Sequence, residues 1–204
     1  MAHEGLWEQL VELDEQKTAQ RAQCQYIKNP ERYVITLLNA DYVVRLADRQ
    51  IFSVRQESEP TSAEFLEQLS ILAYLINAKD VPLANKLVRA ETLPAGQFFF
   101  RGLHGLPTEK LEEAFGQCPD KLFDVAERFG GERRSFGDAS IQLHVLPRIP
   151  LTIVIWRGDE EFAARASVLF DQSAADQLPL DALLAAVNLA IGALVKAAQT
   201  SAYG

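Results

Sequence analysis

Cysteine is scarce in this chain, and that scarcity excludes sites built from several thiolates. The only two cysteines are Cys24 and Cys118, which are not spaced as a pair of metal ligands. An iron–sulfur cluster normally takes four thiolates, so two cysteines cannot hold one. The first residues are acidic and lead into no apolar signal segment, so a disulfide is not expected either. We therefore expect a reduced, cytoplasmic protein.

An excess of basic residues is also missing. The chain has 20 Lys and Arg against 28 Asp and Glu, a formal net charge of −8, and neither half is basic. Proteins that follow a phosphate backbone need a basic surface. The composition therefore argues against a nucleic-acid partner.

No apolar run has the length of a membrane span. Residues 180–198 are apolar on almost every face, but only fourteen residues separate Asp181 from Lys196, with Asn188 midway. A span needs about 20 apolar residues. We expect no membrane insertion, but a C-terminal helix buried between layers or half covered by a second subunit. A homodimer through this helix is the simplest way to cover it.

The remaining pattern predicts an α+β domain that spans residues 1–204. Apolar residues at helical spacing predict a peripheral amphipathic helix over 4–24, ended by Asn29-Pro30. Three β-rich runs with short polar connections predict a three-strand antiparallel meander. Capping-box spacing from Thr61 to Glu64 predicts the start of a helix. The three strands are placed at 33–38, 42–46 and 50–54.

The second half of the chain predicts two helices and a hairpin. Residues 83–90 fit a strand or a short helix, and 93–107 are irregular. Helices are expected over 108–115 and 122–129, the second ended by Gly130-Gly131. Strands are expected over 139–146 and 149–156, joined by Pro147-Arg148, and the alternation in 162–170 favours a strand over a helix.

An acidic cluster follows the apolar run from Ile149 to Trp156. Asp159, Glu160 and Glu161 stand where this strand is expected to end, and strand ends often carry sites. If the strand continued, Asp159 and Glu161 would share a face. Carboxylates and a histidine suit a metal ion, and the alternative is a solvated turn. The candidate metal ligands are Asp159, Glu161, His144 and Asp171.

Two further segments are candidates for ligand binding. His104 lies between glycines, beside three phenylalanines that include Phe99, and just before a helix. Such a segment suits a planar or anionic small molecule, and the alternative is a turn over a phenylalanine-lined core. Arg133 and Arg134, in a glycine-bounded segment, would suit a carboxylate or phosphate, and the alternative is a plain connector.

Several motifs resemble an uncharacterised domain-of-unknown-function family of bacteria and archaea. They are Gln97–Pro107, Gly137–Ala139, Leu146–Pro150, Trp156–Phe162 and Leu169–Asp171. The resemblance implies that some members are joined to iron–sulfur cluster-binding domains, which are similar to those of corrinoid proteins in anaerobic metabolism. The resemblance implies that Asp159 to Phe162 and Asp171 belong to a recurrent pattern. A cluster role does not transfer, because this chain lacks the cysteines.

Complete catalytic motifs are absent. The chain has no HExxH or HxH arrangement, no nucleophile elbow and neither glycine pattern for nucleotide phosphates. The first interpretation is therefore a cytoplasmic module that binds a small molecule or a protein, as an accessory of anaerobic cofactor metabolism. The second is a metal-dependent hydrolase-like enzyme that uses the acidic cluster with a histidine. The third is a structural interaction protein without a pocket.

Overall fold

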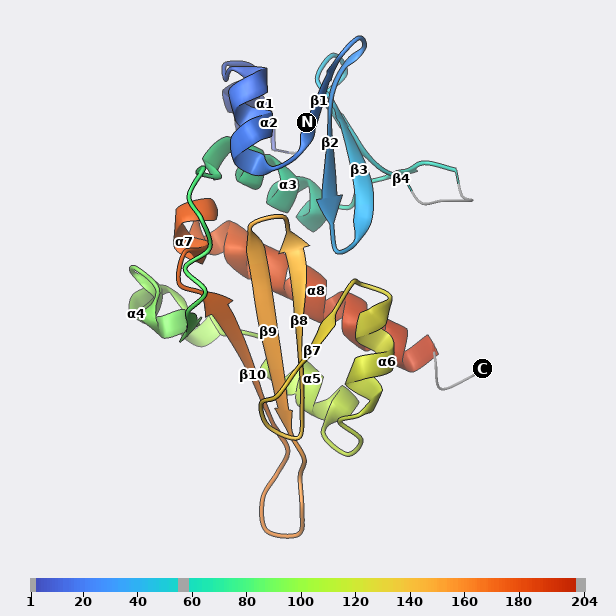
Figure 1. Ribbon diagram of the computed structural model, residues 1–204, viewed down its shortest axis with the longest axis vertical. Coiled ribbons are helices and arrows are strands. Elements are labelled where there is room, and N and C mark those ends of the chain that lie inside the picture. The colour runs from blue at the N-terminus through green and yellow to red at the C-terminus, as the bar shows by residue number, and fades with distance from the viewer. Residues whose placement is uncertain (1–2, 55–58, 201–204) are drawn as a thin grey trace.

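The computed structural model describes residues 3–54 and 59–200, and they form an α+β fold (Figure 1). Within these residues there are eight α-helices and two five-stranded antiparallel sheets. The first sheet comes from the N-terminal part of the chain. The second sheet comes mainly from residues 132–171 and lies against the C-terminal helix, coloured red in Figure 1. The α+β prediction is confirmed.

The first sheet is a meander in the order β1-β2-β3-β4-β5. Alternate residues of β2, among them Tyr33, Ile35 and Leu37, are buried, as expected for a strand with one covered face. The three predicted strands form its centre, and one short strand extends it at each edge. The strands are β1 (Gln25–Lys28), β2 (Glu31–Leu37), β3 (Ala40–Arg45), β4 (Gln50–Val54) and β5 (Thr61–Ser62).

The predicted helix over residues 4–24 is wrong as a single element. It consists of α1 (Glu4–Val11) and α2 (Glu15–Ala22), and Asp14 separates them. The Asp14 carboxylate accepts a hydrogen bond from the N–H of Lys17 (2.8 Å), which starts a new helix at this point. Trp7 and Leu10 of α1 are buried, so this helix belongs to the core.

The helix predicted after Thr61 is present as α3 (Phe65–Asn77), but its cap is different. Glu64 is the N-cap, and it forms a capping box with Glu67. Thr61 and Ser62 instead pair with Ser53 and Phe52 of β4, so they are unavailable to the helix.

The second sheet has the order β6-β10-β9-β8-β7. Its central hairpin has the predicted bounds, and the strand preferred for residues 162–170 is present but starts at Arg165. The ambiguous segment 83–90 contributes a short strand, and the segment around Arg133 contributes another, which the sequence did not indicate. The strands are β6 (Leu87–Arg89), β7 (Glu132–Arg134), β8 (Ala139–Leu146), β9 (Ile149–Trp156) and β10 (Arg165–Asp171).

The helices between the sheets are short. The irregular segment 93–107 contains only α4 (Gly96–Phe99) and a single 3₁₀ turn, Gly102–His104. Both helices predicted after it are confirmed within a few residues. They are α5 (Thr108–Phe115) and α6 (Lys121–Glu127), and α7 (Ala174–Gln177) precedes the last helix.

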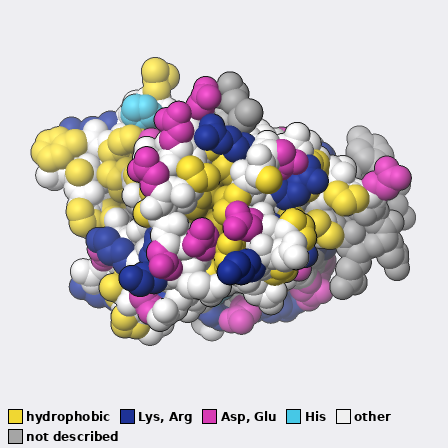
Figure 2. Space-filling model, turned by 90° about the horizontal axis from the view of Figure 1, so that it is seen from above, with side chains coloured by type: hydrophobic (Ala, Val, Ile, Leu, Met, Phe, Trp, Pro, Cys, Tyr) yellow, Lys and Arg dark blue, Asp and Glu magenta, His cyan; other side chains and the backbone are white. Residues whose placement is uncertain are grey.

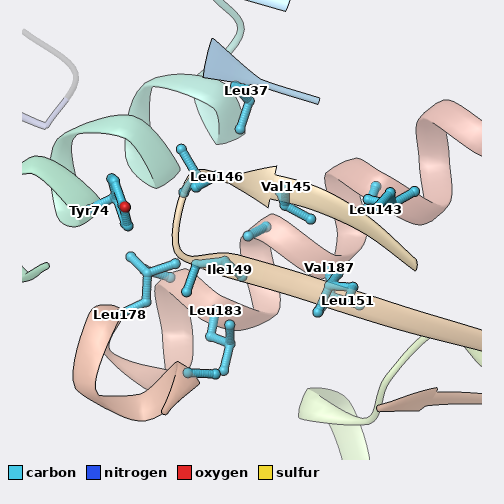
Figure 3. Packing of buried hydrophobic residues seen from close by; sticks show 14 of the residues in the cluster. Leu37, Tyr74, Leu143, Val145, Leu146, Ile149, Leu151, Leu178, Leu183 and Val187 are labelled. Atoms are coloured by element: carbon cyan, nitrogen blue, oxygen red, sulfur yellow. The ribbon is translucent and has the colours of Figure 1, made fainter. Parts of the chain in front are cut away.

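The last helix, α8 (Leu180–Thr200), is the centre of the core. It contacts α3, α5, α6, α7 and β8, and Figure 3 shows Leu183 and Val187 beside the hairpin residues Ile149 and Leu151. Its length and apolar composition alone would suit a membrane span. Its contacts are those of a helix buried between layers, as predicted.

The chain itself covers most of α8. The exposed residues between its two ends are Gly192, Lys196 and Gln199, which form one narrow stripe. The apolar surface that suggested a second subunit is therefore largely buried within one chain. A homodimer through this helix stays a prediction.

Direct hydrogen bonds join the two halves of the chain. The N–H of Leu38, at the β2–β3 turn, donates to the carbonyl of Val145 in β8 (3.0 Å). The buried guanidinium of Arg148, in the β8–β9 turn, donates to the carbonyls of Arg21 and Val81 (both 2.8 Å). Buried apolar residues of both halves form one continuous cluster.

Candidate functional site

The second sheet has two unlike faces. The inner face carries Ile141, Leu143 and Val145 of β8, which are fully buried toward the helices. Figure 1 shows α8 behind β8 and β9 and no described helix in front of them. Because side chains alternate along a strand, the residues between these positions point to the other side. We call this side the open face; it carries Leu87, Arg89, Arg134, Ser140, Gln142, His144, Pro150, Thr152, Val154, Trp156, Arg165, Ser167, Leu169 and Asp171.

A ladder of polar side chains crosses the open face. The Arg134 guanidinium donates to the carboxylate of Glu132 (2.9 Å) and to the amide oxygen of Gln142. The Gln142 amide nitrogen in turn donates to the Thr152 hydroxyl (3.4 Å). These side-chain hydrogen bonds join β7, β8 and β9. The Arg134 guanidinium is therefore already bonded to Glu132 and Gln142.

His144 and Asp171 lie on the two sides of Pro150, and both line one cavity of about 190 Å³. Arg134 lines this cavity as well. Three of the residues singled out in the sequence therefore come together. His144 is exposed, and its Nδ1 lies 3.1 Å from the carbonyl oxygen of Pro147.

The carboxylate of Asp171 serves the fold. One oxygen accepts hydrogen bonds from the N–H groups of Ala84 and Ser173 (both 2.9 Å) and from the Ser173 hydroxyl (2.5 Å). Burial alone would raise its pKa, but these hydrogen bonds to the ionised form outweigh burial and lower the pKa. Asp171 thereby fixes the segment that leads into β6.

Apolar side chains are exposed around this polar centre. Leu87, Phe136 and Trp156 are 37%, 45% and 39% exposed, which leaves much of three large apolar side chains in water. The N–H of Phe136 donates to the Ser140 hydroxyl (2.8 Å), so the turn that carries Phe136 leans over the sheet. Arg165 lies over the Trp156 ring, with its guanidinium carbon 6.0 Å from the centroid.

The acidic cluster lies at the far end of β9 from His144. The strand ends at Trp156, as expected, so the condition under which Asp159 and Glu161 would share a strand face is not met. The Asp159 carboxylate accepts the N–H groups of Glu161 (2.9 Å) and Phe162 (2.7 Å), which is the turn that was the alternative interpretation. Residues 3–54 and 59–200 contain no group of three His, Cys, Asp or Glu that could hold a metal ion. A metal site at Asp159, Glu161, His144 and Asp171 finds no support in this geometry.

Arg133 and Arg134 lie on opposite faces of β7. Arg134 joins the open face, whereas the Arg133 guanidinium carbon lies 4.3 Å from the ring centroid of Phe123 in α6. Consecutive strand residues alternate, so the two side chains diverge and do not converge on one anion.

His104 and Phe99 form a separate stack. Their ring centroids are 4.8 Å apart with an interplanar angle of 6°. Beside them, Phe98 is 72% exposed and Leu103 fully exposed. Figure 2 shows hydrophobic side chains protruding at the left edge, the side on which Figure 1 places α4. This segment protrudes from the surface, and the stacked rings of His104 and Phe99 belong to it.

Four residues of the open face were missed as candidates from sequence: Leu87, Arg89, Trp156 and Arg165. Leu87 and Arg89 lie in the segment that fitted a strand or a short helix. The sequence therefore did not decide on which face their side chains lie. Trp156 and Arg165 end two neighbouring strands, and only their pairing brings them together. The alternation of Arg165, Ser167 and Leu169 was the available signal.

A family model for a domain of unknown function, DUF3786, matches residues 14–193. The protein belongs to this family. The matched region includes both sheets of this DUF3786 protein, and with them every residue of the open face. No curated protein and no solved structure matches the chain.

Proposed function

We propose that this DUF3786 protein is a binding module that docks another protein on the open face of its second sheet. The observation that carries the proposal is the exposure of Leu87 and Trp156 on a sheet face that no described helix covers (Figure 1), and of Phe136 in the turn that leans over this face. Exposed apolar patches rimmed by polar residues are typical of protein–protein interfaces, where aromatic residues and arginine are enriched.

On the open face, a protein partner is better supported than a small molecule. Cavities of about 190 and 270 Å³ reach this face. Pockets for small molecules usually measure about 300–1,000 Å³ and enclose most of the ligand. A broad surface with a few arginines and aromatic rings suits a macromolecule instead.

No observation favours the hydrolase, because the Asp159 carboxylate of its acidic cluster bonds to its own turn. We place the interaction in the cytoplasm, which the two free thiols support. The role as an accessory of anaerobic cofactor metabolism depends only on the resemblance stated above, and the partner would belong to that metabolism.

Site-specific photo-cross-linking in the native host tests the proposal. Benzoylphenylalanine replaces Phe136, in the turn over the open face, in one variant and Phe65 in a control variant. Phe65 is a matched control, since it is 60% exposed at the start of α3, outside the second sheet. We expect one reproducible adduct from position 136 and none of the same mass from position 65.

Two results would count against the proposal. Position 136 could yield no adduct, or both positions could yield the same adducts, which would indicate non-specific contact. An adduct of twice the chain mass would identify a second copy as the partner, which tests the homodimer in the same experiment. A Trp156→Ser variant should weaken the adduct at position 136 if the face acts as one surface.

A further inference from the structure

The outer strand β6 of the second sheet is shorter than its neighbour β10. β6 pairs only with Leu169, Phe170 and Asp171 of β10, because the chain turns away after Arg89 and buries Ala90. The first part of β10, from Arg165 to Val168, continues beyond the end of β6. That part pairs with β9 on one side and has no strand on the other within the described chain.

A groove follows this uncovered edge. It has a volume of about 270 Å³ and runs along five consecutive residues of β10, Arg165 to Leu169. Its opposite wall comes from Ala90, Phe100, Leu106 and Thr108. We call it the β10 groove; it occupies the position that β6 would fill if it were longer.

A side chain takes the place of a strand partner at this edge. The N–H of Ala166 donates to Oε1 of Glu112 in α5 (3.0 Å). The Ile155 carbonyl opposite Ala166 accepts from Asp138 on the β8 side, so Ala166 directs its main-chain groups away from β9. Alternate residues direct these groups to the same side, so Val168 presents its own to the groove.

Two arginines mark the ends of the β10 groove. Arg89 is the last residue of β6, and Arg165 is the first of β10. Neither forms an ion pair with any described residue, although Arg165 lies over Trp156. Glu91 also lines the groove, and the Glu112 carboxylate lies at its edge. Unpaired guanidinium groups favour carboxylates on an incoming segment.

We propose that an extended segment of the partner, with alternating apolar and acidic residues, adds as a strand to β10 in this groove. The inference rests on the proposed function and specifies which part of the partner binds. The added strand replaces the Glu112 carboxylate at the N–H of Ala166. Its apolar side chains face Phe100 and Leu106, and its acidic side chains face Arg89 and Arg165. Strand addition takes affinity from main-chain bonds and specificity from alternate side chains.

The test uses the full chain and two blocked pentapeptides, one alternating aspartate with valine and one alternating lysine with valine. Amide NMR spectra are recorded during titration. We expect the acidic peptide to shift the amides of Ala166 to Leu169, and the basic peptide to leave them unchanged. Neutralising both arginines (Arg89→Gln with Arg165→Gln) should lower the affinity for the acidic peptide about tenfold, as expected from the loss of two exposed ion pairs. Arg32→Gln is the control, since Arg32 lies in β2 of the first sheet, outside the open face and the groove.

Glu112→Ala supplies an independent readout. It frees the N–H of Ala166, so the acidic peptide should bind more tightly than to the wild type. Equal shifts with both peptides, or no shift at Ala166 to Leu169 even in Glu112→Ala, would overturn strand addition. If position 136 still cross-links a partner in that case, the open face stands as the interface and only the inference fails. If the acidic peptide binds but position 136 yields no adduct, the groove stands as a strand-binding site and the open face fails as the interface.

Discussion

The hydroxyl of Tyr74 accepts a hydrogen bond from the N–H of Arg148 (3.1 Å) and lies 3.2 Å from the carbonyl oxygen of Ala22, to which it donates. Tyr74 is in α3, Arg148 in the β8–β9 turn, and Ala22 ends α2. One buried hydroxyl therefore joins three segments that are distant in the sequence. The same turn carries the Arg148 side-chain bonds to Arg21 and Val81, so it is the main junction between the two halves.

Tyr74→Phe should destabilise the protein. The substitution leaves a buried N–H and a buried carbonyl without their partner, which costs about 1–3 kcal/mol of the free energy of unfolding. Chemical denaturation measures the change. Tyr26→Phe is the control, because Tyr26 is only partly buried and its change should stay within about 0.5 kcal/mol. An unchanged denaturation midpoint in Tyr74→Phe would contradict the role of the hydroxyl.

Asp171→Asn should reduce stability in a pH-dependent way. The pKa of Asp171 is lowered in the folded protein, so its contribution is present above the ordinary pKa and is lost as pH falls through the folded pKa. At pH 7 the free energy of unfolding of the variant should be about 1–3 kcal/mol lower, because a neutral amide oxygen accepts these three hydrogen bonds more weakly than an ionised carboxylate. Below pH of about 4 the difference from the wild type should narrow.

Denaturation at a series of pH values checks this prediction. The exposed Asp124→Asn serves as the control and should show no comparable trend. A constant difference between wild type and Asp171→Asn from pH 7 to pH 3 would show that ionisation of this carboxyl is irrelevant to the fold.

The two thiols should differ sharply in reactivity. Burial raises the pKa of Cys24 to about 12, and the nearby Arg21 guanidinium offsets burial only in part. Cys118 is exposed. Since the thiolate is the reactive form, iodoacetamide at pH 8 should modify Cys118 and leave Cys24 intact until the protein is unfolded. Mass spectrometry of the wild type and Cys118→Ser measures both, and rapid labelling of folded Cys118→Ser would refute the prediction.

Neighbouring substitutions in α8 should have opposite effects. Ile191 is fully buried, so Ile191→Ala should cost about 2–5 kcal/mol through lost contacts and the cavity left behind. A methyl group added at Gly192 would meet no atom within 4 Å. Gly192→Ala should therefore raise stability by about 0.5–1 kcal/mol through helix propensity. Thermal denaturation of both variants compares them, and similar losses would mean that α8 buries a different face.

The acidic turn should be dispensable for metal content. Asp159 bonds to its own turn, so the double change Asp159→Ala with Glu161→Ala should leave the metal content of purified protein at the wild-type level. Elemental analysis of protein purified from the native host checks it. A metal that is present in the wild type and lost in the double variant would restore the hydrolase interpretation.

Local sequence was sufficient where one long pattern had one physical solution. The apolar run from Ile149 to Trp156, preceded by an alternating run and Pro147-Arg148, has no stable alternative to a buried hairpin, and β8 and β9 have the predicted bounds. The apolar C-terminal segment likewise had to be covered on nearly all sides.

Short edge strands were beyond prediction because their partners define them. β5, β6 and β7 contain two or three residues each, too few for a period to be recognised. Thr61 had the spacing of a helix cap, but pairing with Ser53 decided otherwise. The sequence placed Arg133 and Arg134 together in a loop. They lie in β7, where consecutive side chains point to opposite faces, so they diverge.

The sequence by itself determined the α+β class, the central hairpin and the buried last helix, since each follows from where apolar residues must go to leave water. Only the tertiary structure decided that no described helix covers one face of the second sheet (Figure 1), and that the Asp171 carboxylate holds the segment leading into β6. Those outcomes depend on register and on side-chain partners far apart in the chain, which no local pattern records.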